Sequence, residues 1–264
     1  RSVALNQLAQ ATGNNYTITI QPAAAVSTEL LISGPGFSQG MIRLNGADNV
    51  TFDGGASRYF RFRNLNTVAS PTFTFLNDAV GNTITRSTIE SGNTSSTSGT
   101  VLFYNSSTAV TSTGNDNNTI SDNDIRGLST TGGATHANAV YSFSATGTGT
   151  GTNSGITISN NRIYDWTNAG VLTATTGTGD SWTVSGNALY QTATRTTTLT
   201  GIQLAAGSAG TLASIKRNLL EAPTQTLSES MAAEVPRHKA CGLTADHVEA
   251  ARAFVEKRPP VFAR

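Results

Sequence analysis

The chain has 264 residues, and its 17 Lys and Arg nearly balance its 16 Asp and Glu, which leaves a formal net charge of +1. This balance argues against a nucleic-acid-binding protein, which normally carries a clustered basic face. No apolar run approaches the roughly 20 residues needed to cross a bilayer, so no membrane insertion is expected.

Composition divides the chain into two parts, residues 1–220 and 221–264. The first part is crowded with Thr, Ser, Asn and Gly and carries apolar residues at regular places, which favours strands. The second part holds two of the three Lys, two of the three His and the single Cys241, which alone cannot form an internal disulfide. We expect polypeptides of two different origins. Because the chain begins at Arg1 with neither Met nor a signal peptide, we also expect a piece or a processed product of a longer protein.

The N-terminal residues predict a cap. The stretch SVALNQLAQATG has the pattern of a short amphipathic helix, and YTITIQP after it alternates like a strand. Together these elements would cover an otherwise open end of a sheet.

A repeated unit follows, in which an apolar residue, two variable residues, Asn or Ser, one variable residue and a second apolar residue succeed one another. A further short apolar run comes after each unit, as in GTVLFYN, ANAVYSF, AGVLTAT and TGIQLAA, so each repeat predicts three short strands. Phe60, Arg63 and Leu65 fit the unit more loosely. The clear matches are Ile84–Ser87–Ile89, Ile120–Asn123–Ile125, Ile158–Asn161–Ile163, Val184–Asn187–Leu189 and Ile215–Asn218–Leu220.

Three strands per repeat predict an all-β solenoid of stacked coils. A single coil cannot bury its own apolar side, whereas stacked coils form parallel sheets around one continuous core. The first apolar residues of the five units then lie over one another. The repeated Asn are expected at corners, where Asn tolerates left-handed backbone. Asn in successive coils are also expected to form a hydrogen-bonded ladder, made of Asn123, Asn161, Asn187 and Asn218.

The register implied by the apolar residues also aligns side chains of opposite charge. It places Arg86 against Asp122, and Asp124 against Arg162 in the next coil. Such cross-strand pairs each contribute roughly 0.2–1 kcal/mol. One outward row is predicted to contain Glu90, Arg126, Tyr164 and Tyr190.

Few residues of the body point to chemistry. Asp122 and Asp124 lie close together, but we interpret them as ion-paired corner residues because a hard-cation site needs six or more oxygens. His136 stands alone in a Gly-Thr loop, where we expect it to be exposed to solvent. The Arg58, Arg61 and Arg63 cluster is interpreted as a solvated strand edge. No catalytic residue, metal site or cofactor site is predicted.

The densest aromatic group is the candidate ligand site. Exposed rings bind sugars, whereas the alternative is a stacked aromatic ladder or a loop clamp. The candidate glycan-binding residues are Tyr164, Trp166, Trp182 and Tyr190.

The residues after 220 predict helices. Thr244 is a helix cap, Asp246 and His247 lie in the first turn, and Pro259 and Pro260 stop the helix. Its apolar stripe is predicted to contain Val248, Ala251, Phe254 and Val255. These helices are expected either to cover the last coil over Leu219 and Leu220 or to be loosely attached.

The segments YTITIQPAAAVSTELLISG, IRLNGADNVTFDGG, GNTITRSTIESG, NNTISDNDIRG and DSWTVSGNALYQTATRT resemble the right-handed parallel β-helix repeats of large secreted bacterial surface proteins, the pectate-lyase-like superfamily in its broad sense. The resemblance covers roughly residues 15–220. It implies a right-handed single-stranded parallel β-helix and an extracellular or cell-surface location, but no single activity.

The segment EAARAFVEKRPPVF resembles the C-terminal end of the enoyl-CoA hydratase (crotonase) family, which suggests a chimera or fusion. In that family the catalytic carboxylates and the oxyanion hole lie upstream, on a fold that residues 1–220 do not encode, so the tail predicts no hydratase activity.

The leading functional hypothesis is a non-enzymatic scaffold or adhesive segment whose partner is a polysaccharide or a cell-surface glycan. The alternative is a polysaccharide lyase or glycoside hydrolase of the β-helix superfamily. Clustered carboxylates in one groove would favour the enzyme.

Overall fold

The computed structural model describes residues 2–7, 15–36, 39–105, 112–128, 135–144, 151–174, 181–204, 224 and 226–257. The chain forms two compact units, Arg1–Ala205 and Ala206–Arg264. The predicted change of origin between residues 220 and 221 lies outside the described residues and stays a prediction.

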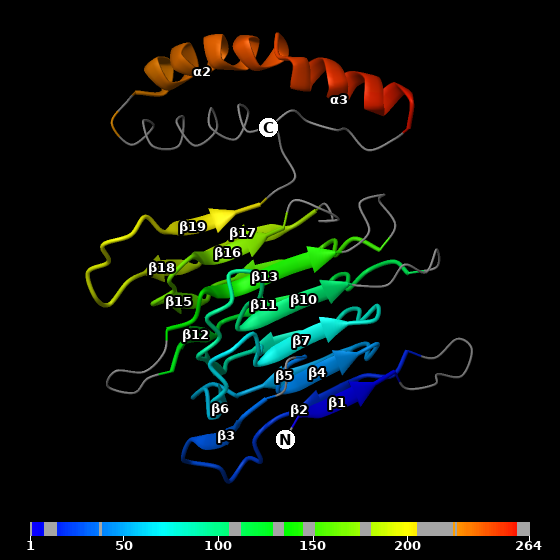
Figure 1. Cartoon of the computed structure of the whole chain (residues 1–264), viewed down its shortest axis with the longest axis vertical. Helices are drawn as coiled ribbons and strands as arrows, with labels where there is room; N and C mark the ends of the chain where they lie inside the picture. The colour runs from blue at the N-terminus through cyan, green and yellow to red at the C-terminus, as the bar shows by residue number, and fades with distance from the viewer. Residues whose placement is uncertain are drawn as a thin grey trace. The chain divides into compact units, whose positions relative to one another are not determined.

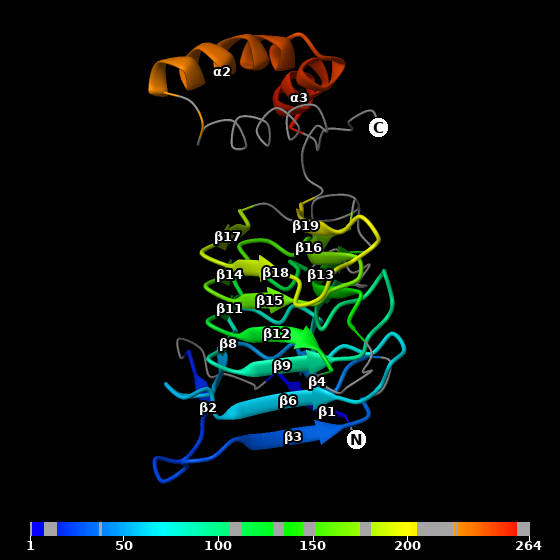
Figure 2. The same ribbon diagram turned by 90° about the vertical axis from the view of Figure 1, so that its left-hand side faces the viewer.

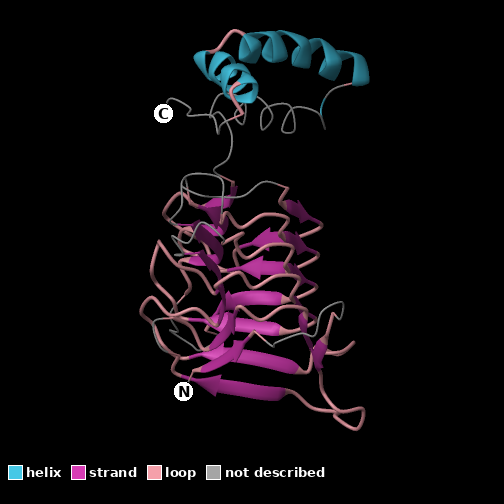
Figure 3. Cartoon of the chain, turned by 90° about the vertical axis from the view of Figure 1, so that its right-hand side faces the viewer, coloured by secondary structure: helices cyan, strands magenta, loops and turns pink. Residues whose placement is uncertain are grey.

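The first unit is a right-handed parallel β-helix, as predicted (Figure 1). Its described strands form three parallel sheets, and each successive coil adds a strand to the stack, as Figure 2 and Figure 3 show from two sides. Sheet A, in the order β1-β4-β7-β10-β13-β16-β19, contains Val3–Asn6, Ile42–Asn45, Phe73–Leu76, Val101–Asn105, Asn138–Ser144, Ala169–Thr173 and Thr200–Gln203. Sheet B, in the order β2-β5-β8-β11-β14-β17, contains Ile18–Ile20, Val50–Asp53, Thr83–Thr85, Thr119–Ser121, Thr157–Ser159 and Thr183–Ser185. Sheet C, in the order β3-β6-β9-β12-β15-β18, contains Leu30–Gly34, Phe60–Asn64, Thr88–Ser91, Asp124–Gly127, Arg162–Tyr164 and Ala188–Tyr190.

Columns of apolar side chains fill the interior. In sheet B, Ile84 lies over Phe52 and under Ile120, and the column continues through Ile158 to Val184, as predicted. Ile215 lies outside the described residues. The matching column of sheet C contains Phe62, Ile89, Ile125, Ile163 and Leu189. Its first four members are fully buried, so stacking supplies the core that no single coil has.

The coils nearest the N-terminus carry phenylalanines in these columns. Phe62 lies edge-on to Phe52 and to Phe73, with ring centroids 5.8 and 4.9 Å apart. Phe75 stacks on Phe103 at 4.6 Å. The core therefore changes from aromatic to aliphatic along the stack.

The Asn residues of the repeat form a buried chain of hydrogen bonds. Asn123 donates its backbone N–H and its Nδ2 to Asn161 Oδ1 at 2.9 and 3.2 Å, and Asn161 bonds Asn187 Oδ1 in the same way at 2.9 Å for both. Nδ2 of Asn161 also donates to the Ile120 carbonyl at 2.9 Å, so the side chains satisfy backbone groups at the turn. Asn218 lies outside the described residues.

The predicted reason for Asn at these corners is wrong. The left-handed backbone belongs to the preceding residue of each corner, Arg86, Asp122, Asn160 and Gly186, with φ between 49° and 66°. Asn123, Asn161 and Asn187 do not have positive φ, and their amides serve the coil interior instead. Comparable ladders that the repeat did not predict join Asn82 to Asn118 and Asn115 to Asn153.

Two further predictions are wrong. Val3–Asn6 is strand β1, paired with β4, and not part of a helix, because Val3 and Leu5 extend the apolar columns of Ile42 and Leu44. The loose repeat at Phe60 and Leu65 is out of register: the residues that align with Ile84 and Ile89 are Phe52 and Phe62.

In the second unit, the described helices are α2, Leu227–Gly242, and α3, Ala245–Val255. Thr244 caps α3 as predicted, since its Oγ1 accepts the His247 backbone N–H at 3.2 Å. The helix ends at Val255, before the two prolines, which lie outside the described residues. The predicted apolar stripe is exposed, and Ala253 is buried instead. No described helix is long and apolar enough to span a membrane.

Candidate functional site

The outer face of sheet C carries two in-register rows of side chains. Alternate residues of a strand point to opposite faces, so the residues between the core positions line this face. The first row contains Leu31, Arg61, Thr88, Asp124, Arg162 and Ala188. The second row contains Ser33, Arg63, Glu90, Arg126, Tyr164 and Tyr190, which includes the predicted row from Glu90 to Tyr190.

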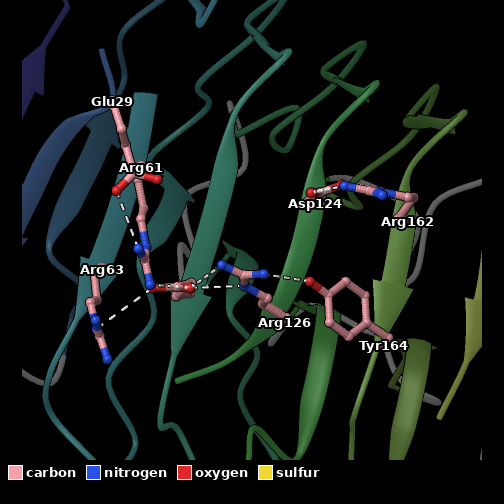
Figure 4. Close-up of polar contacts among 8 residues, drawn as sticks. Glu29, Arg61, Arg63, Asp124, Arg126, Arg162 and Tyr164 are labelled. Carbon is pink, nitrogen blue, oxygen red and sulfur yellow. Dashed lines mark hydrogen bonds and ion pairs between the residues drawn. The ribbon is translucent and has the colours of Figure 1, made fainter. Parts of the chain in front are cut away.

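Glu90 lies at the centre of the second row and is fully buried among three arginines. Its carboxylate accepts Arg61 Nε and Nη2 at 2.9 and 3.0 Å and Arg126 Nε at 2.8 Å. Arg63 Nε lies 3.6 Å from Oε2. Arg61 and Arg126 come from the coils on either side of Glu90, and Figure 4 shows their guanidinium groups directed toward each other, with Glu29 beside Arg61. The hydrogen bonds to Glu90 raise the pKa of Arg61 against the opposing effect of burial.

Arg126 links the charged residues to the aromatic ones. Its Nη1 donates to the Tyr164 hydroxyl at 2.7 Å, and the Tyr164 ring stacks on Tyr190 with centroids 4.9 Å apart. Burial lowers the pKa of Arg126, but its hydrogen bond to Tyr164 and the charge of Glu90 outweigh this and leave the pKa raised. Burial raises the pKa of Tyr164, and Arg126 acts in the opposite direction.

A second ion pair lies beside this cluster in the first row. Asp124 bonds Arg162 across neighbouring coils, as the register predicts. Together the four arginines of both rows, Arg61, Arg63, Arg126 and Arg162, face three carboxylates, Glu29, Glu90 and Asp124. Four positive and three negative charges leave this face with a formal charge of +1. Within the described part of the chain, Arg63 Nε has no hydrogen-bond partner, so Arg63 is held less firmly than Arg61 and Arg126 in the Glu90 cluster.

The arginine cluster predicted as a solvated strand edge instead contacts residues of the next two coils. Arg61 and Arg63 bond or approach Glu90, and Arg58 Nε donates to the Asp122 carbonyl at 2.8 Å. The predicted pair of Arg86 with Asp122 does not form as the main contact, because Arg86 binds Asp53 of the preceding coil. That hydrogen bond is the main cause of the raised pKa of Arg86.

The structure separates the four aromatic candidates. Tyr164 and Tyr190 are stacked on the outer face of sheet C, and Tyr190 is 39% exposed. Trp166 is buried in the core. Trp182 is partly buried, lies edge-on to Phe103 at 5.8 Å, and donates its Nε1 to the Asn153 carbonyl at 2.7 Å. Only the two tyrosines therefore share a face on which a ligand could contact them together.

His136 is fully buried, so the prediction that it is exposed is wrong. Its Nε2 lies 3.1 Å from the Tyr164 carbonyl, and its Nδ1 lies 2.6 Å from Thr100 Oγ1. A carbonyl can only accept, so Nε2 carries the proton and the Thr100 hydroxyl donates to Nδ1. Burial lowers the pKa of His136 from 6.5 to about 4. The Gly- and Thr-rich sequence around His136 did not indicate that its side chain is buried and hydrogen-bonded.

Four further aspartates of the β-helix hold its turns. Asp53 accepts the Gly55 backbone N–H, and Arg86 lowers the pKa of Asp53 through its hydrogen bond. Asp48, Asp78 and Asp116 accept backbone N–H groups of neighbouring coils at 2.7–2.9 Å. Among the described residues, no group of three or more His, Cys, Asp and Glu could hold a metal ion.

No protein-family model, curated protein or solved structure matches the chain. The parallel β-helix follows from the strand order and register of the described residues.

Proposed function

We propose that the β-helix is a non-enzymatic scaffold or adhesive segment of a secreted bacterial surface protein, related to the pectate-lyase-like superfamily in its broad sense. The observation that carries this proposal is the use of carboxylates. Glu90 and Asp124 bind arginines across coils, and Asp48, Asp78 and Asp116 hold backbone N–H groups. A carboxylate occupied in this way is held by the stack and is poorly placed to act as an acid, base or nucleophile.

We place the glycan contact on the outer face of sheet C, at Tyr164, Tyr190 and the arginines beside them. Tyr190 is 39% exposed, and the side chain of Arg162 is half-exposed. Such a surface can hydrogen-bond sugar hydroxyls and pack against their apolar faces. Its small positive charge suits a neutral or weakly acidic glycan.

The test is a panel of neutral and acidic polysaccharides incubated with the whole chain. Binding is measured by affinity electrophoresis, and cleavage is followed by new reducing ends or unsaturated products. We expect retardation by at least one polysaccharide without cleavage. Reproducible cleavage would replace this proposal with the lyase or hydrolase alternative.

A matched pair of variants locates the contact. Tyr190→Ala should weaken binding roughly two- to tenfold, because one aromatic contact is worth about 0.5–1.5 kcal/mol beyond its buried area. Tyr104 is the control, since it is 37% exposed and also stacks on a neighbouring ring, Phe143, but lies on sheet A. Equal losses in both variants, or a loss only in Tyr104→Ala, would place the contact elsewhere.

We also propose that the helical unit has a different origin from the β-helix and lacks hydratase activity. Helix α3 includes the segment from Glu249 to Val255 that resembles the end of the crotonase family. A helix of this length supplies neither a general acid and base nor an oxyanion hole. An assay of the whole chain with an enoyl-CoA is expected to show no hydration, and turnover above background would contradict this.

A further inference from the structure

The outer face of sheet B carries two rows of hydroxyl side chains. Alternate residues of each strand point away from the core, and parallel pairing places them over one another from coil to coil. The first row contains Thr19, Thr51, Thr83, Thr119, Thr157 and Thr183. The second row, two residues further along each strand, contains Asp53, Thr85, Ser121, Ser159 and Ser185. Every member of the two rows except Asp53 therefore has a hydroxyl group.

This uniformity distinguishes sheet B from the other two sheets. The outward rows of sheet C mix arginine, carboxylate and tyrosine, and sheet A presents the stacked rings of Tyr104 and Phe143. On the described strands of sheet B, no outward residue is aromatic, and the single charged one, Asp53, is paired with Arg86. The Thr-rich composition of the chain alone would not sort hydroxyl groups onto one face.

The first row is open to water. Ile84, Ile120 and Ile158, which lie between the two rows along their strands, are fully buried, whereas the six threonines are half-buried or exposed. Within the described part of the chain, the hydroxyl groups of the first row make no hydrogen bond to protein. In the second row, Ser121 Oγ donates to Thr85 Oγ1 at 3.1 Å. Because a hydroxyl donates one hydrogen bond and accepts two, the first row presents its full capacity to solvent.

The two rows form a regular grid. Neighbouring strands lie about 4.7–4.9 Å apart, and residues two apart along a strand are separated by about 6.6 Å. Over the six strands of sheet B, the first row therefore extends about 24 Å. Threonine is branched at Cβ, which restricts its χ1 angle, so its hydroxyl and methyl groups hold their positions without further ordering.

We propose that the outer face of sheet B binds ice. The water oxygens on the prism faces of hexagonal ice repeat on a rectangular grid of closely similar dimensions, so waters held by the hydroxyl rows can occupy lattice positions. Ordered water of this kind bridges two polar surfaces at little cost in free energy. The near absence of charge on this face favours the fit, because ionic groups orient water in ways that ice does not accommodate.

Binding of this kind stops ice growth. Ice between neighbouring bound chains must advance as a curved front, which lowers its freezing temperature below its melting temperature. This activity uses a different face from the glycan contact on sheet C, so the two proposals stand or fall separately.

Thermal hysteresis tests the proposal. It is the gap between the melting and freezing temperatures of a single ice crystal in a solution of the whole chain. We expect a gap that grows with protein concentration, and ice crystals that develop facets. Melting and freezing temperatures that coincide at every concentration, with crystals that stay round, would overturn the proposal.

Matched variants locate the activity. Thr119→Tyr places a bulky ring in the middle of the first row and should remove most of the hysteresis, as should Thr157→Tyr in the next coil. Thr197 is an exposed threonine in the connection between β18 and β19, and Thr197→Tyr should leave the hysteresis unchanged. Circular dichroism verifies that each variant is folded.

The polysaccharide panel is repeated with the same variants. If the two sheet B variants lose polysaccharide binding but keep their hysteresis, the hydroxyl rows contact a glycan and the proposal is wrong. Equal hysteresis in all three variants would likewise exclude sheet B as the ice-binding face.

Discussion

Acidification is expected to destabilise the β-helix through His136. The imidazole is fully buried and neutral, with Nε2 donating to the Tyr164 carbonyl and Nδ1 accepting from Thr100. A proton added to Nδ1 would leave two donors facing each other until the Thr100 hydroxyl turned away. Burial is the main cause of the low pKa, while the nearby charges of Asp165 and Arg195 act in opposite directions.

The pKa values fix the direction and the size of the effect. The pKa of His136 is about 4 in the folded chain against 6.5 for the exposed side chain, so the unfolded chain binds the proton first as the pH falls. Stability is therefore full above pH 6.5 and declines between pH 6.5 and 4. Linkage gives a loss of about 2 kcal/mol at pH 5 and about 3 kcal/mol below pH 4.

The assay is urea unfolding at a series of pH values, followed by tryptophan fluorescence. Both tryptophans, Trp166 and Trp182, belong to the first unit, so the signal reports the β-helix and not the helices. His136→Gln keeps a donor for the Tyr164 carbonyl but does not titrate. Carboxylates also titrate at low pH, so the quantity of interest is the difference between the two proteins. Equal losses of stability between pH 7 and 5 in both proteins would refute the reasoning.

Three further predictions concern the stability of the stack, measured by the same urea assay. Glu90→Gln should cost about 3–5 kcal/mol, because three arginines lose a buried partner, whereas Asp124→Asn, whose partner Arg162 is half-exposed, should cost about 1 kcal/mol or less; similar losses would contradict the special role of Glu90. Gly155→Ala should cost more than Gly55→Ala, because both have φ near +70° but a Cβ at Gly155 would lie 2.3 Å from Asn117 Oδ1, and at Gly55 nothing lies within 4 Å; the strain of φ alone is worth about 1–2 kcal/mol, and equal costs would show that the Asn117 side chain moves aside freely. Asn161→Ala should cost about 2–4 kcal/mol, because it leaves two buried backbone groups of the preceding coil, the Asn123 N–H and the Ile120 carbonyl, unsatisfied at about 1–3 kcal/mol each, and a loss below about 1 kcal/mol would show that water replaces the amide.

The architecture could be predicted because one periodic signal repeats. The positions of Ile84, Ile120, Ile158 and Val184 determine which residues stack, and once the stacking is known, the pairing of Asp124 with Arg162 follows. Errors arose where the spacing is irregular. Between Phe52 and Phe62 the corner is longer than in later coils, so the repeat was placed at Phe60.

The polar contacts of the outer face were predictable only in part. The register predicts which residues of the second row are neighbours. It does not predict the contact of Arg61 with Glu90, because the long Arg61 side chain crosses from the first row to the second. The burial of His136 depends on Tyr164 and Thr100, which come from different coils. A local sequence cannot report such neighbours, and the Gly-Thr composition around His136 suggested solvent instead.

The Asn corners show a related limit. Asn is favoured both where the backbone is left-handed and where an amide must bond to backbone groups, and the sequence does not separate these roles. At these corners the left-handed backbone belongs to Asp122 or Asn160, and the amide that bonds to backbone groups belongs to the residue that follows.

Because the core changes from phenylalanine to smaller residues along the stack, the coils of the β-helix are expected to unfold in a fixed order. In a stack of this kind each coil is held by its neighbours, so disruption begins at the weakest layer and advances one layer at a time. In the described core, Phe52, Phe62 and Phe73 pack edge-on in neighbouring layers, whereas the sheet B column ends at the smaller Val184. Pulled from its two ends, the β-helix should yield in steps of one coil, with the aromatic layers the last to part.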